Sequence, residues 1–97
     1  MNIYDINTPK NAETFTTLLE HKNIKINSIV SSDIIEAIEY VQAEDEWLVL
    51  LEGEATLLIN NEEKTLYKGD TLFIAAKVPH TILKTQDGTV WLTVHIF

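Results

Sequence analysis

Four polar side chains in this sequence have the types and spacing to act together on a small molecule. Tyr40, Gln42 and Glu46 lie close together in the chain, and His80 follows much later. Residues two apart on a β-strand share a face, so paired strands in a suitable register would project all four side chains into one cavity. A phenol, an amide, a carboxylate and an imidazole could bind a small polar ligand, with His80 or Glu46 as candidate catalytic acid or base. The alternative is a hydrogen-bonded polar plug that binds nothing.

A metal site is a second interpretation of these residues. Glu46 and His80 are suitable ligands for Fe, Mn, Zn or Ni, and His95 near the C-terminus could add a third ligand. In the predicted strand at residues 90–97, either face could point inward. His95 would therefore face the pocket in one orientation and point away from it in the other. Two strong ligands hold a metal poorly in competition with water, and Tyr and Gln are weak or unusual ligands. We therefore expect the pocket to work without a tightly bound metal.

These side chains need elements that hold them in place, and the sequence predicts strands for most of its length. Asn60-Asn61 and Asp87-Gly88 are turn signals between apolar runs. About eight short strands with turns between them indicate an all-β sandwich or barrel, and the absence of helical patterns between them disfavours a parallel α/β sheet. The predicted strands cover residues 24–30, 34–40, 47–51, 55–59, 65–67, 71–74, 81–85 and 90–97.

The N-terminal part has a different pattern. Residues 1–10 indicate an extended arm, and residues 11–22 a short helix, because Phe15, Leu18 and Leu19 have the i, i+3, i+4 spacing of a helical face. Asn11 suits the N-cap of this helix. We therefore expect a single domain over residues 1–97, with the arm, the helix and then a β-barrel over residues 24–97.

The composition of the chain limits which classes of partner it can bind and where in the cell it is expected. The chain has 97 residues, enough for one domain, and its 15 Asp+Glu against 7 Lys+Arg give a net charge of -8. Nucleic acids and anionic membranes are poor partners for such a chain. It has no cysteine, which leaves no disulfide or thiolate metal site. It shows neither a signal-peptide pattern nor an apolar run long enough to span a membrane, so we expect a soluble cytoplasmic protein.

The order of certain residues resembles the two motifs of the cupin family. Glu46 and Gly53 have six residues between them, and Gly69-Asp70 and Pro79-His80 follow. In the family this order accompanies a double-stranded β-helix, also called a jelly-roll barrel. The resemblance therefore implies a cupin-type barrel whose pocket holds Glu46 and His80.

The chain departs from the family pattern at the metal motif. A metal-binding cupin carries His-x-His before the glutamate, and this chain has Tyr40-Val41-Gln42 there. This variant resembles a subgroup of small stand-alone bacterial cupins without a settled activity. The resemblance implies a protein that binds a small polar ligand without the usual metal, and whether it is an enzyme stays open. The alternatives are a metal-dependent oxygenase or isomerase using Glu46 and His80, and a structural dimer with a vestigial pocket.

The predicted strand at residues 47–51 indicates that another surface covers the barrel. Trp47 and Val49 lie on one of its faces, and Leu48 and Leu50 lie on the other, so both faces are apolar. A strand buried on both faces in such a small barrel needs a second cover. The N-terminal helix could provide it, but we predict a homodimer with sheets packed face to face.

Overall fold

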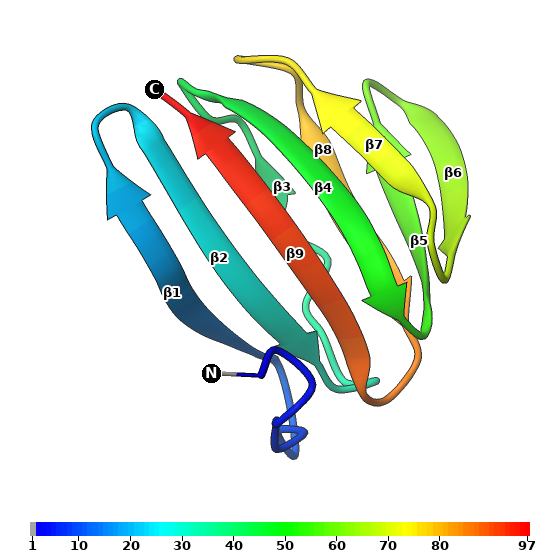
Figure 1. The fold of residues 1–97 in the computed structure, drawn as a ribbon. Helices are drawn as coiled ribbons and strands as arrows, with labels where there is room; N and C mark the ends of the chain where they lie inside the picture. Colours follow the sequence, from blue (N-terminus) through cyan, green and yellow to red (C-terminus); the bar gives the residue numbers. More distant parts are fainter. Residues whose placement is uncertain (1) are drawn as a thin grey trace.

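A computed structural model describes residues 2–97 as two antiparallel sheets that face each other (Figure 1). The five-stranded sheet has the order β1-β2-β9-β4-β7, and the four-stranded sheet has the order β3-β8-β5-β6. The predicted all-β jelly-roll architecture is confirmed. The strands are β1 (Glu13–His21), β2 (Ile24–Ser31), β3 (Glu39–Tyr40), β4 (Asp45–Glu52), β5 (Glu54–Ile59), β6 (Glu62–Tyr67), β7 (Thr71–Ile74), β8 (His80–Thr85) and β9 (Thr89–Ile96).

The core lies between the two sheets. Side chains alternate along each strand, so every second residue of β4 and β9 faces the opposite sheet. Leu48, Leu50 and Trp91 enter the core from the five-stranded sheet, and Leu57 enters it from β5. All four are almost fully buried, and burying one such side chain contributes about 1.5–3 kcal/mol. This packing fixes the distance between the sheets and hence the width of any cavity between them.

The predicted helix at residues 11–22 is wrong. Glu13–His21 form β1, an edge strand that pairs with β2 along its length. The threonines of this segment are β-branched and favour a strand. The pairing register shifts around Leu18, and a β-bulge of this kind adds one residue to the strand. The extra residue gives Phe15, Leu18 and Leu19 a spacing that imitates a helical face.

The other predicted elements are mostly present. The run at 34–40 is the exception, because only Glu39–Tyr40 pairs with a neighbouring strand. Asn60 and Asn61 form the predicted hairpin turn with φ of 48° and 67°, the positive values that a tight hairpin requires. Among residues 2–97, no helix is long and apolar enough to cross a membrane.

Gly53 connects the two sheets between β4 and β5. Its φ is 91°, a conformation that L-residues rarely adopt. A Cβ atom there would lie 2.4 Å from the Thr89 hydroxyl oxygen and 2.8 Å from the Thr89 Cα. Glycine is therefore required for two reasons, the backbone conformation and the close approach of β9.

A row of apolar side chains crosses the outer face of the five-stranded sheet. Strand pairing aligns one residue from each strand in this row, and Trp47 lies next to Phe73 and Val94 in it. Three of the row's side chains are substantially exposed in the single chain. We call this the outer apolar row: Leu19, Ile26, Val94, Trp47 and Phe73.

Candidate functional site

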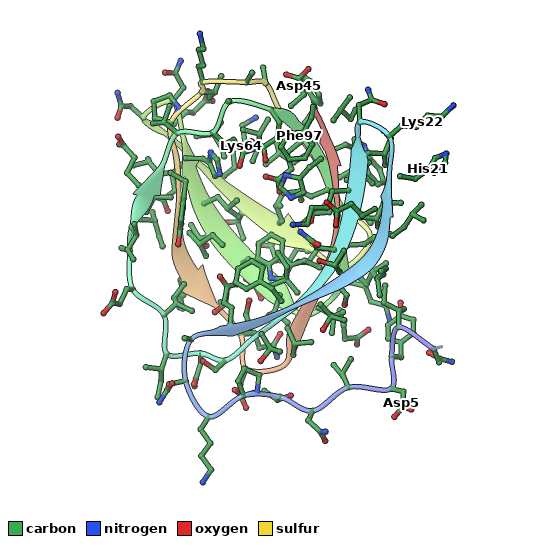
Figure 2. The ribbon with its side chains drawn as sticks, turned by 90° about the vertical axis from the view of Figure 1, so that its left-hand side faces the viewer. Asp5, His21, Lys22, Asp45, Lys64 and Phe97 are labelled. Atoms are coloured by element: carbon green, nitrogen blue, oxygen red, sulfur yellow. The ribbon has the colours of Figure 1, made fainter. Side chains whose placement is uncertain are left out.

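A cavity of about 150 Å³ lies between the two sheets. A cavity of this size can hold a ligand about as large as a six-membered ring. Trp91, Phe15 and aliphatic side chains from both sheets provide most of its lining. Figure 2, viewed from the β1 side, shows side chains of both sheets filling the remaining space between them. The polar side chains that line the cavity are Glu13, Tyr40, Gln42, Glu46, His80, Thr93 and His95.

The four predicted ligand-binding residues all line this cavity. Tyr40 of β3 pairs with His80 of β8, and their ring centroids are 6.0 Å apart. The Gln42 amide Nε2 donates a hydrogen bond to Glu46 Oε1 at 3.0 Å. Glu46 and His80 are buried, whereas Tyr40 is half exposed and therefore lies at the rim. These four side chains therefore lie together as their spacing in the sequence predicts, and their role in binding stays a prediction.

The hydrogen bonding of His80 identifies its tautomer. Its Nδ1 lies 3.1 Å from the Val78 carbonyl oxygen, which can only accept, so Nδ1 carries the proton of the neutral ring. The other ring nitrogen, Nε2, is then an acceptor. A neutral His80 can therefore accept a hydrogen bond or a proton from a ligand in the cavity.

His95 also faces the cavity, which settles the orientation of the last strand. In β9, Trp91, Thr93 and His95 point inward. His95 Nδ1 lies 3.0 Å from Glu44 Oε2 and 4.0 Å from Glu46 Oε1. Its Nε2 lies 3.2 Å from the Thr93 hydroxyl oxygen. The imidazole thus lies between two carboxylates. Glu44, which is not part of the motif, holds the His95 ring in position through this contact.

The candidate metal ligands do not form a metal site. Both ring nitrogens of His95 have protein partners, and Glu46 Oε1 accepts from Gln42. His80 is left with one ring nitrogen for another partner. Within residues 2–97, no group of three or more His, Asp or Glu side chains is arranged to hold a metal ion. The third histidine, His21, ends β1 and points away from the space between the sheets (Figure 2).

Glu13 is a cavity residue that the sequence pattern did not reveal. It lies at the start of β1, and its Oε2 accepts a hydrogen bond from the Ser31 hydroxyl. Ser31 in turn accepts a hydrogen bond of 2.9 Å from the Trp91 indole Nε1. Burial raises the pKa of the Glu13 carboxyl above its ordinary value of 4.5, and the Ser31 hydrogen bond opposes this shift. Glu13 and Phe15 alternate with threonines, which indicates a strand with both side chains on one face. The helical spacing of Phe15, Leu18 and Leu19 obscured this signal.

Two facing antiparallel sheets with a small cavity between them define a jelly-roll barrel with a pocket. The family model of the cupin domain matches residues 36–96, more than half of the chain. The chain therefore belongs to the cupin family, as the motif resemblance implied.

Solved structures support the same fold. A protein from Ralstonia eutropha JMP134, provisionally named a mannose-6-phosphate isomerase, is similar at 30% identity with a TM-score of 0.88, over 99% of this chain and 95% of that one. A cupin superfamily protein from Desulfitobacterium hafniense is 20% identical with a TM-score of 0.85, over 98% and 86% of the two chains. A protein of unknown function from Streptococcus pyogenes is 18% identical with a TM-score of 0.85, over 99% and 84%. No curated protein matches the sequence.

Proposed function

We propose that this protein binds a small organic molecule in the cavity between its sheets. The observation that carries the proposal is the arrangement of polar side chains around one largely apolar cavity between the sheets. Such a combination, in which a few convergent polar groups orient a ligand against an apolar wall, is typical of small-molecule sites. Glu46 and His80 are buried where they could hydrogen-bond a ligand, which fits a binding role better than a plug on the surface.

The lining modifies the predicted chemistry of the ligand. The sequence suggests a small polar or carbohydrate-like ligand, but Trp91, Phe15 and aliphatic side chains surround much of the cavity. An apolar wall favours a ligand with an apolar body, because burying such surface gives about 25 cal/mol per Å². We infer a compact ligand with an apolar ring or chain and one or two polar groups.

Binding in this proposal does not depend on a metal. Gln42 Nε2, Glu46 Oε1 and His95 Nδ1 already have protein partners, so the ligand would be bound through His80 Nε2 and Glu46 Oε2, which have no hydrogen-bond partner among the described residues. Glu46 and His80 stay the candidate acid and base if the cavity also supports a reaction. A cytoplasmic location, expected from the sequence, belongs to the same proposal.

The test uses benzyl alcohol, a neutral probe that matches the size of the cavity. The protein has two tryptophans, so its indole N–H signals in an amide-detected NMR spectrum can be followed separately. We expect benzyl alcohol to shift the Trp91 signal and leave the Trp47 signal in place, including after treatment with EDTA. Glu46→Gln and His80→Ala should weaken the effect, and Glu62→Gln, on exposed β6, is the control. Equal binding by both cavity variants and the unchanged protein would reject this site.

A further inference from the structure

The cavity has acidic groups but no permanent cation. Glu13 and Glu46 line it, and its lining includes no Lys. All seven basic residues of the chain are lysines, so there is no arginine to hold a phosphate or carboxylate in the usual bidentate manner. A ligand with an anionic group would therefore meet carboxylates in a space where charges are poorly screened. The charge of the cavity favours a neutral or cationic ligand.

The carboxylates differ in what the protein provides for them. Glu46 accepts a hydrogen bond from the Gln42 amide, and His95 lies between Glu46 and Glu44. Glu13 accepts one hydrogen bond, from the Ser31 hydroxyl to Oε2, and forms no ion pair among the described residues. Its other oxygen, Oε1, accepts no hydrogen bond within the same part of the chain. Glu13 is thus the cavity carboxylate with the fewest protein partners.

Buried groups also hold Glu13 in a defined position. Ser31 is fully buried and receives the indole N–H of Trp91, which is itself 2% exposed. The Ser31 hydroxyl accepts from the indole N–H and donates its own proton to the Glu13 carboxylate. The chain from Trp91 through Ser31 to Glu13 therefore holds the carboxylate at the cavity wall before any ligand arrives, which lowers the entropic cost of binding.

We propose that Glu13 binds an ammonium group, and that the ligand is a small organic amine whose apolar part lies in the cavity near Trp91. This inference rests on the proposed binding function and specifies the chemical class of the ligand. An ammonium would form a charge-assisted hydrogen bond with Oε1, and the faces of Trp91 and Phe15 can add cation–π attraction. The raised pKa of Glu13 agrees with a carboxylate buried without a cation, the situation that a bound ammonium would relieve.

Three probes of almost the same size separate the possibilities: benzylamine, benzyl alcohol and benzoate. We expect benzylamine to bind about tenfold more tightly than benzyl alcohol at neutral pH, as one charge-assisted hydrogen bond would give, and benzoate to bind most weakly. The Glu13→Gln variant should lose this preference for the amine while still binding the alcohol. Retained alcohol binding also shows that the variant is folded. Glu62→Gln makes the same charge change on exposed β6 and should keep the preference.

The outcomes distinguish this inference from the function on which it rests. If benzoate binds as tightly as benzylamine, or if Glu13→Gln keeps the tenfold preference, the assignment of an amine to Glu13 is overturned and the cavity still stands as a binding site. Loss of the preference in Glu46→Gln but not in Glu13→Gln overturns the choice of carboxylate. If none of the three probes shifts the Trp91 indole signal, the binding function and this inference both fall.

Discussion

At the residue scale, the burial of the Glu13 carboxylate carries a free-energy cost that its contacts offset only in part. The carboxylate is partly removed from water, has a hydroxyl as its hydrogen-bond partner, and has no cation beside it in the described structure. Desolvation penalises the charged form, and one neutral hydrogen bond offsets only part of that penalty.

Glu13→Gln should therefore raise the stability of the free protein at neutral pH. Because the folded-state pKa of Glu13 lies above the ordinary 4.5, the folded state binds the proton more tightly, and stability falls as pH rises from 4.5 through the folded pKa. The glutamine variant lacks this loss and can still accept a hydrogen bond from Ser31. Urea unfolding should show no difference between the two proteins below pH 4.5 and a growing advantage of the variant above it. A variant less stable than the original protein at neutral pH would contradict the expectation.

The sequence was informative for those site residues whose position depends on strand periodicity. The spacing of Gln42 and Glu46, together with His80 of the second motif, was enough to place them at one cavity. The orientation of His95 was undetermined, because β9 has apolar residues at alternate positions on both faces and periodicity cannot distinguish them. Glu44 and Glu13 lie outside the motifs, and only their contacts to His95 and Ser31 reveal them.

At the element scale, the connection between β4 and β5 is constrained both by its backbone conformation and by a neighbouring strand. Gly53 and Gly69 both have positive φ, of 91° and 89°, but only Gly53 has another strand against its Cα. A Cβ at Gly69 would meet nothing within 4 Å. The two glycines therefore separate the effect of backbone strain from the effect of a steric clash.

Gly53→Ala should destabilise the protein far more than Gly69→Ala. Gly69→Ala carries only the backbone cost, about 1–2 kcal/mol, whereas Gly53→Ala adds a clash with Thr89 that overpacking data place at about 1–3 kcal/mol more. Thermal unfolding of the two variants measures the difference. Equal losses of stability would show that β9 moves aside at no cost.

Strand β1 shows why local periodicity can mislead. Its apolar residues match a helical spacing only because a bulge near Leu18 adds one residue to an otherwise alternating strand. Pairing with β2 along most of β1 decides the conformation, and the apolar spacing within β1 alone does not reveal this pairing. The barrel from β4 to β9 was easier to predict, since turn residues such as Asn60-Asn61 mark where its strands end.

At the scale of the whole molecule, the outer apolar row and the net charge act together. Two copies of a chain with a charge of -8 repel each other, so association requires a surface without charge. The outer apolar row runs across all five strands of its sheet and contains no charged residue. We propose that a second copy covers it, which is the face-to-face homodimer that the sequence predicted.

Light scattering at micromolar concentration should give twice the 11.0 kDa of the single chain. Phe73→Glu places a charge in the outer apolar row and should produce monomers. Tyr67→Glu is the matched control, because Tyr67 is 57% exposed against 56% for Phe73 but lies on β6 of the other sheet. A mass of 11.0 kDa for the unchanged protein, or dissociation by both substitutions, would reject this interface.

The shortness of β3 has a consequence for the rate at which a ligand comes and goes. Tyr40 is held at the rim of the cavity by a strand of two residues, Glu39 and Tyr40, which pair only with Thr81 and His80. Elements with few paired residues open locally at much lower free energy than the core does. Detachment of β3 would remove Tyr40 from the rim of the cavity while Trp91 and Leu48 stay packed. The opening of these two residue pairs at the edge of one sheet would then set an upper limit on the rate of ligand exchange.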